Sequence, residues 1–137
     1  EKYRFSSTEQ YMMFQKAILF GDNQTAMQIL KTSNPRKQKQ LGREIQGFNQ
    51  STWDEEKKSI VYKGNYLKFT QNAELLEILL ATQGTLLVEA SPTDKIWGVG
   101  MDLDTPELYI PSKWKGENLL GFILTQLRED ILNKRAV

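Results

Sequence analysis

The sequence has neither a cysteine nor a histidine among its 137 residues. The absence of cysteine excludes disulfide bonds and thiolate metal sites. The absence of histidine removes the usual general base, the Ser–His and Cys–His nucleophile pairs and the commonest zinc ligand. Any acid–base chemistry must therefore use carboxylates, lysine or tyrosine, and we expect no metal and no other cofactor.

A large charge of either sign is also missing, because 18 basic residues stand against 17 acidic ones. No overall field therefore attracts the chain to nucleic acid or to an anionic membrane, although a local basic patch remains open. No apolar run approaches the roughly 18 residues of a membrane span, and no stretch has the order of a signal peptide. Together with the lack of cysteine, these absences predict a cytoplasmic protein with no membrane partner.

The length of the chain suits one domain with a substantial core. No internal repeat, low-complexity block or linker interrupts it, so we predict a single compact domain over residues 1–137 with a frayed tail at 133–137. Because the chain begins at Glu1, close to a predicted helix start, we expect further residues upstream. The sequence does not indicate an oligomeric state.

A helix start at Ser6 is predicted by Glu9 three residues later, which is the spacing of a capping box. Glu9 and Lys16 are seven residues apart, which places them on one helix face with their backbones roughly 10 Å apart. Met12 and Met13 lie between them, so this face can line a pocket with a carboxylate and an amine. The same residues also fit a plain helix, in which Glu9 is a cap, Lys16 is solvated and the methionines are core.

The most basic segment follows Ser33-Asn34-Pro35, which predicts a helix cap with proline at the first helical position. Its basic residues are Arg36, Lys37, Lys39 and Arg43. Such a run is usually a solvated helix face, but it can also hold a phosphate. Gly42-Arg43 at its end is our first candidate for that role.

Helices account for most of the predicted structure. Further helices are expected after Gly21-Asp22-Asn23, from Ser51, after Asn72 and after Asn118. Gly64, inside the helix that starts at Ser51, is expected to permit close packing. Residues 85–90 are short, apolar and partly β-branched, and they are the best strand candidate. The fold class is therefore mostly α with a minor α+β character, a multihelical domain of five or six helices with one or two short strands.

Tryptophans lie close in sequence to carboxylates at the edges of predicted elements. Asp94 stands three residues before Trp97, and Trp53 adjoins Asp54. An aromatic wall suits a planar base, and its apolar surface raises a carboxyl pKa toward the range of a general acid. Structural roles are equally compatible with the pattern, because Trp53 can staple a helix entry and Asp94 can close a turn. Gly98, after Trp97, indicates an unusual dihedral or a close backbone approach.

A series of short motifs resembles the NADAR family in order and spacing over residues 6 to 132. The motifs are Ser7-Thr8-Glu9-Gln10-Tyr11, Gln15-Lys16, Gly42-Arg43, Trp53, Lys68-Phe69, Leu87-Val88-Glu89-Ala90-Ser91-Pro92 with Asp94, Trp97-Gly98, Trp114, Gly116-Glu117-Asn118-Leu119-Leu120-Gly121 and Leu127-Arg128. The resemblance implies a mostly helical fold and hydrolysis of an N-glycosidic bond between a ribose and a base-like amine. Characterised members act on early phosphorylated intermediates of riboflavin biosynthesis, or remove ADP-ribose from guanine in DNA.

The resemblance also implies roles for individual residues. The positions that match the functional residues of the family are Glu9, Lys16, Trp53, Asp94 and Trp97. Glu9 would stabilise charge at C1′ or activate water while Asp94 protonates the departing amine, and these two roles are interchangeable at this stage. Trp53 and Trp97 would border the base. Lys16 would pair with phosphate or attack C1′ of a ring-opened ribose to form an imine. The further substrate-binding candidates are Arg43, Gly98 and Asn118.

The chain departs from the family pattern at two places. The usual histidine after the motif glutamate is Gln10 here, and the N-terminal strand of the family, with its Phe- and Asn-containing segment, has no counterpart. Two other functions therefore stay open: a non-catalytic module that binds ADP-ribose-like or NAD-like ligands, and a helical interaction domain. As an enzyme, its partner would be a small phosphorylated N-riboside or an ADP-ribosylated guanine, including one within nucleic acid. The near-neutral charge favours the small substrate over a DNA duplex.

Overall fold

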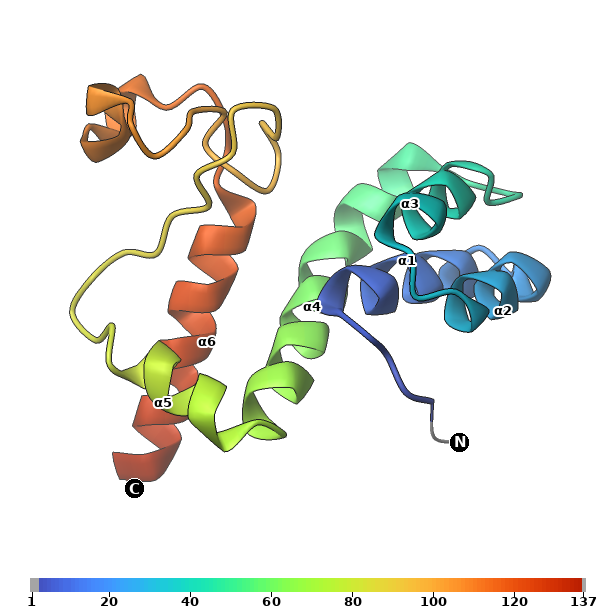
Figure 1. Ribbon diagram of the computed structural model, residues 1–137, viewed down its shortest axis with the longest axis horizontal. Helices are drawn as coiled ribbons and strands as arrows, with labels where there is room; N and C mark the ends of the chain where they lie inside the picture. The colour runs from blue at the N-terminus through green and yellow to red at the C-terminus, as the bar shows by residue number, and fades with distance from the viewer. Residues whose placement is uncertain (1–2, 137) are drawn as a thin grey trace. The chain divides into compact units, whose positions relative to one another are not determined.

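A computed structural model describes residues 3–136 of the protein. This range contains six α-helices and two short 3₁₀ helices, and no β-strand (Figure 1). The predicted mostly α fold is confirmed, and the predicted one or two strands are wrong. The chain divides into two compact units, Glu1–Lys68 and Phe69–Val137, which are described separately below. The prediction of one domain over the whole chain stays a prediction.

The first unit is built around its first three helices. It contains α1 (Thr8–Leu19), α2 (Asn23–Lys31), α3 (Pro35–Arg43) and all but the last two residues of α4 (Gln50–Thr70). Helix α1 packs against both α2 and α3. The buried residues of this core are Phe14, Ala17, Ala26, Ile29, Leu41 and Ile45. The apolar stripes of three amphipathic helices therefore form one core, and their polar faces remain at the surface.

Two glycines allow helices of the first unit to approach closely. A Cβ atom added at Gly64 of α4 would lie 2.7 Å from Cδ2 of Tyr11 in α1, so the aromatic ring rests on the bare backbone of α4. A Cβ atom added at Gly42 of α3 would collide with the sulfur of Met13. The expected packing role of Gly64 is therefore confirmed.

The N-terminal cap of α1 differs from the prediction by one residue. Ser7 is the cap, because its Oγ accepts a hydrogen bond of 3.0 Å from the backbone N–H of Gln10. The side chain that reaches back is that of Gln10, whose Oε1 accepts from the backbone N–H of Ser6 at 2.5 Å. The capping pattern Ser-x-x-Gln has therefore replaced the expected Ser6-x-x-Glu9 pair, and Glu9 takes no part in the cap.

The predicted helix starts after Asp22 and after Asn34 are confirmed, whereas the predicted start at Ser51 is wrong by one residue. Asp22 caps α2 through a 3.1 Å bond from the backbone N–H of Thr25. Asn34 caps α3 with Pro35 at the first helical position. Helix α4 starts at Gln50 rather than Ser51, because Asn49 Oδ1 accepts from the backbone N–H of Thr52 at 3.0 Å.

The second unit combines two α-helices with a long irregular segment. Its elements are α5 (Ala73–Leu80), η1 (Pro106–Tyr109), η2 (Pro111–Lys113) and α6 (Leu119–Ala136). Helix α6 continues to Ala136, so the tail expected to fray from residue 133 is helical that far, and Val137 lies outside the described residues. A separate small core contains Val99, Met101 and Leu108. Among the described residues, no helix is long and apolar enough to span a bilayer.

Residues 85–90, the predicted strand, pair with no other strand within residues 3–136. The backbone N–H of Leu87 donates to Thr125 Oγ1 at 3.0 Å, and that of Glu89 donates to Asn118 Oδ1 at 2.9 Å. Because side chains from the end of the chain satisfy these backbone groups, no ladder with a second strand forms. The prediction was wrong because short apolar runs do not reveal what their backbone will bond.

Candidate functional site

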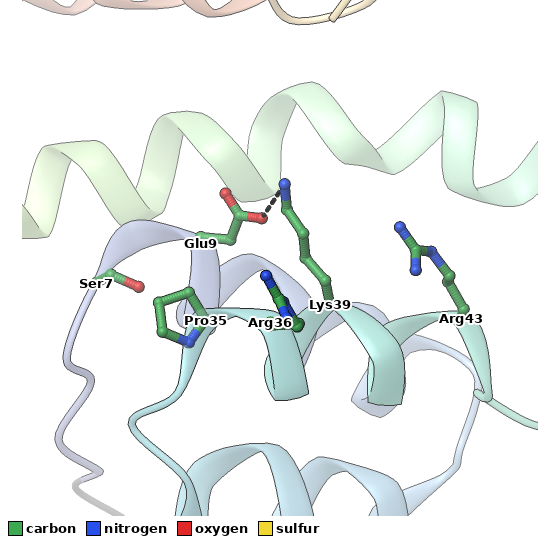
Figure 2. A pocket seen from close by; sticks show the side chains of 6 residues that line it. All are labelled: Ser7, Glu9, Pro35, Arg36, Lys39 and Arg43. Atoms are coloured by element: carbon green, nitrogen blue, oxygen red, sulfur yellow. Dashed lines mark ion pairs between the residues drawn. The ribbon is translucent and has the colours of Figure 1, made fainter. Parts of the chain in front are cut away.

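A pocket of about 510 Å³ opens in the first unit between the start of α1 and the outer face of α3 (Figure 2). Its lining residues are Ser7, Glu9, Pro35, Arg36, Lys39 and Arg43. The residues at 36, 39 and 43 recur at intervals of three and four, so they follow one face of α3. One carboxylate therefore shares the pocket with three cationic side chains.

Glu9 and Lys39 point toward each other across this pocket (Figure 2). Lys39 Nζ lies 3.6 Å from Glu9 Oε1, and the two side chains are 56% and 40% exposed. An exposed pair of this kind contributes at most about 1 kcal/mol, because water screens the attraction. Arg36 and Arg43 form no ion pair within residues 3–136. An anion in the pocket can therefore bind the guanidinium groups of Arg36 and Arg43 and the ammonium group of Lys39, which is only weakly paired with Glu9.

Gln10, next to Glu9, fixes the start of α1. Its side chain is 2% exposed, and its amide nitrogen donates to the carbonyl oxygens of Ile29, Leu30 and Thr32 at 3.1, 3.3 and 3.0 Å. These carbonyls lie at the end of α2, where a helix leaves acceptors without intrahelical partners. Gln10 therefore holds the first turn of α1 against α2, while Glu9 faces the pocket.

Lys16 is surrounded by aromatic rings two turns further along α1. Its Nζ lies 4.9 Å from the ring centre of Phe48 and 5.4 Å from that of Trp53. Lys16 forms no ion pair within the described part of the chain, and burial lowers the pKa of its amine below the usual value. Lys16 does not line the pocket that contains Glu9. The structure therefore places Trp53 beside Lys16, and it adds Phe48, which the sequence analysis missed.

The two units differ strongly in charge. Residues 1–68 contain twelve basic and seven acidic side chains, whereas residues 69–137 contain six basic and ten acidic ones. The near-neutral total conceals this division. An anionic ligand is therefore attracted to the unit that carries the pocket.

Asp94, Trp97 and Gly98 belong to one turn of the second unit. Asp94 Oδ1 accepts hydrogen bonds from the backbone N–H groups of Ile96 and Trp97, at 3.0 and 2.8 Å. A Cβ atom added at Gly98 would lie 2.8 Å from the carbonyl oxygen of Glu89. The expected close backbone approach at Gly98 is confirmed, and the neighbour is the chain itself. Asp94 closes the turn that presents Trp97.

Asn118 connects this turn to the segment before it. Its side chain is fully buried, with Oδ1 accepting from the N–H of Glu89 and Nδ2 donating 3.1 Å to the carbonyl of Leu87. Its backbone N–H donates to the carbonyl of Gly98 at 3.0 Å, and its φ of 53° lies in the left-handed region that asparagine tolerates. The oxygen and the nitrogen of the Asn118 side-chain amide are thus both hydrogen-bonded to backbone groups.

The predicted residues therefore fall into three groups. Glu9 and Arg43 line the same pocket, and Lys16 lies beside Trp53. In the second unit, Asp94, Trp97 and Gly98 belong to one turn, and Asn118 is hydrogen-bonded to it. The roles predicted for them in catalysis and binding stay predictions. Phe48 gave only a weak sequence signal, a single aromatic residue after Gly47 in a polar loop.

Comparison with known proteins gives consistent matches. A family model of the NADAR domain matches residues 1–132. N-glycosidase R617 of Acanthamoeba polyphaga mimivirus is 46% identical over 126 residues, which cover 92% of this chain and 74% of that protein. Protein irg-1 of Caenorhabditis elegans is 42% identical over 134 residues, which cover 96% of this chain and 63% of that protein.

A solved structure also resembles the chain. N-glycosidase YbiA of Escherichia coli (strain K12) is 32% identical over 125 residues, which cover 91% of this chain and 69% of that protein. The NMR structure of E. coli YbiA matches with a TM-score of 0.75 and 31% identity, covering 94% of this chain and 68% of the other. The chain therefore spans between 63% and 74% of the length of these proteins.

Proposed function

This chain belongs to the NADAR domain family, and we propose that it is an N-glycosidase that hydrolyses the bond between a ribose and a base-like amine. The observation that carries the proposal is the pocket in which Glu9, free of the helix cap, faces three cationic side chains. The relatives R617 and YbiA are named N-glycosidases. This combination of charges suits a sugar phosphate, because a carboxylate can stabilise positive charge at the anomeric carbon and the cations can bind the phosphate.

Glu9 acts at the reacting carbon. Cleavage of an N-riboside passes through a state with oxocarbenium character, in which positive charge develops at C1′. A carboxylate stabilises that charge or takes a proton from the attacking water. Lys39, which pairs with Glu9 in the absence of substrate, turns to the substrate phosphate together with Arg36 and Arg43. The substrate phosphate thereby takes the place of Glu9 as the partner of Lys39.

Lys16 supplies an amine that reacts with a carbonyl-type carbon. Because burial lowers its pKa, a larger fraction of Lys16 is neutral near pH 7 than for a solvated lysine. The neutral amine adds to the C1′=N carbon of a ring-opened N-riboside, the bond from C1′ to the base nitrogen then breaks, and the base leaves as an amine that carries both protons of the Lys16 amine. Water hydrolyses the resulting imine, which returns free Lys16 and the sugar aldehyde. If no imine forms, Lys16 serves the phosphate instead.

The second unit contributes the remaining predicted roles. From the family resemblance, Asp94 is proposed to protonate the departing amine and Trp97 is proposed to border the base. The hydrogen bonds of Asp94 within the described residues use Oδ1, which leaves Oδ2 for a proton. Gly98 and Asn118 fix the backbone of the turn that carries Trp97 and Asp94, which is how we propose that they support binding.

The substrate is proposed to be a phosphorylated N-riboside, either a small ribosylaminopyrimidine phosphate or an ADP-ribosylated guanine. Both carry a phosphate for the cationic face of α3 and a planar base for an aromatic ring. Incubation with the two compounds side by side, followed by chromatographic detection of the released base, distinguishes them. Release of base from neither compound would contradict the proposed function.

The carboxylate is tested by Glu9→Gln with Glu55→Gln as the matched control. Glu55 is exposed on α4 and does not line the pocket. Glu9→Gln should lower kcat by about 100-fold or more, a typical contribution of a positioned acid or base, while Glu55→Gln keeps the original rate. Near-normal turnover in Glu9→Gln would refute its catalytic role. Calorimetry with ADP-ribose tests the alternative, because binding without release of base indicates a non-catalytic module.

A further inference from the structure

The loop between α3 and α4 brings Phe48 against the amine of Lys16. The ring of Phe48 is 41% exposed, and its centre lies 4.9 Å from Lys16 Nζ. The same ring packs edge-on against Phe20, with 5.1 Å between the ring centres. Phe20 follows the last residue of α1, the helix that carries Lys16. One aromatic residue therefore connects the loop to the end of that helix.

The loop itself is held by Asp22. Asp22 Oδ2 accepts from the backbone N–H of Gln46 at 2.9 Å and from the hydroxyl of Thr25 at 2.6 Å. The next residue, Gly47, has a φ of 79°, a conformation that glycine adopts without strain. These two features fix the chain just before Phe48, so the ring beside Lys16 is part of an ordered arrangement.

We propose that Phe48 is the positioning residue of Lys16: with Trp53, its ring confines the amine to one place and shields it from water. The catalytic consequence rests on the proposed function, whereas the placement of the amine does not. Trp53 is 8% exposed and contributes to the core as well. Phe48 is partly exposed and is not part of the buried core, so its replacement should cost less stability than the replacement of Trp53.

Two effects of the ring oppose each other. An aromatic face attracts an ammonium ion and so favours the charged form. Removal of water disfavours the charged form, and burial lowers the pKa of Lys16. Removal of the ring of Phe48 should therefore admit water and return Lys16 toward the behaviour of a solvated lysine.

The first measurement needs no substrate. Lysines are reductively methylated with ¹³C-formaldehyde, and the methyl signal of Lys16, assigned with Lys16→Arg, is followed by NMR as a function of pH. The titration midpoint of Lys16 should rise in Phe48→Ala, rise less in Phe48→Leu and stay in place in Phe48→Tyr. Phe122→Ala is the control, because Phe122 is similarly exposed and belongs to the second unit. An unchanged midpoint in Phe48→Ala overturns the proposal, whatever the activity of the protein.

The second measurement uses turnover. A rise in the pKa of Lys16 lowers its neutral fraction at neutral pH, so kcat at neutral pH should fall by the same factor as that fraction. KM should change little, and the loss should shrink as the pH is raised, which a general loss of folding would not produce. A shifted midpoint in a protein that releases no base from any substrate supports the placement of Lys16 and refutes the proposed function. A pH-independent loss of kcat in Phe48→Ala overturns the proposal.

Discussion

Replacement of Lys39 by glutamine tests whether the pocket holds a phosphate. A hydrogen bond to a charged group contributes about 1.5–3 kcal/mol when it is shielded from water. The side chain of Lys39 is 56% exposed, so we reduce this figure to about 1.4 kcal/mol, which is a tenfold change in an equilibrium constant. Lys39→Gln should therefore raise KM for a phosphorylated N-riboside about tenfold.

The matched control is Lys37→Gln. Lys37 lies on the same helix, is exposed and does not line the pocket, so this variant removes the same charge from the same unit. Its KM should change by less than about twofold, because an exposed charge outside the pocket is screened by salt. The stability of both variants should be within about 1 kcal/mol of the original, since the pair that Lys39 forms with Glu9 is exposed.

The assay is a series of initial rates at two ionic strengths. The KM difference between the two variants should be larger at low salt and smaller at high salt, because the interaction with the phosphate is electrostatic. Equal KM values for Lys37→Gln and Lys39→Gln would refute the phosphate site, since they would show only the effect of total charge. A fall in kcat that exceeds the rise in KM would refute the assignment of Lys39 to binding.

Three further predictions concern the surroundings of the pocket. Gln10→Met should lower the free energy of unfolding by about 2–3 kcal/mol, because the carbonyls at the end of α2 lose a buried donor. The control Gln40→Met, at an exposed site, should lower it by less than about 0.5 kcal/mol. Equal urea midpoints for the two variants would contradict the role of Gln10. The pKa of Asp22 is lowered, first by the backbone N–H of Gln46 and then by Thr25, so ionised Asp22 stabilises the fold above its usual pKa near 3.8, and this stability is lost as the pH falls through the lowered value. Asp22→Asn should flatten the acid limb of a plot of unfolding midpoint against pH, and an unchanged limb would refute the linkage. Borohydride added during turnover should trap a covalent adduct that is absent in Lys16→Arg; no adduct in the original protein would refute the imine.

Local sequence signals predicted the helices well. The helix starts near Gly21-Asp22-Asn23 and Ser33-Asn34-Pro35 were recognised because a capping side chain bonds to backbone only two or three residues away, as Asp22 and Asn34 do. The cap of α1 was assigned one residue too early, since Ser6 with Glu9 and Ser7 with Gln10 have the same spacing. Only the contact of Gln10 with α2, about twenty residues later, distinguishes the two patterns.

Contacts between distant residues were beyond the sequence patterns. The segment 85–90 bonds to Asn118 and Thr125, about thirty or more residues later, so its composition alone favoured a strand. Phe48 reaches Lys16 from a different element, and no periodic pattern connects the two. Glu9 and Lys16 were recognised as functional candidates by the family resemblance, whereas their surroundings became visible only in the fold.

The close approach at Gly64 has a consequence far from its own position. The ring of Tyr11 rests on the bare backbone of α4 at this point, and the same two helices carry Lys16 and Trp53 further along. A methyl group at residue 64 would collide with the ring of Tyr11, so α1 and α4 would have to move apart at this point. That movement would increase the distance between Lys16 on α1 and Trp53 on α4. The place of Trp53 beside Lys16 therefore depends on residue 64 having no side chain.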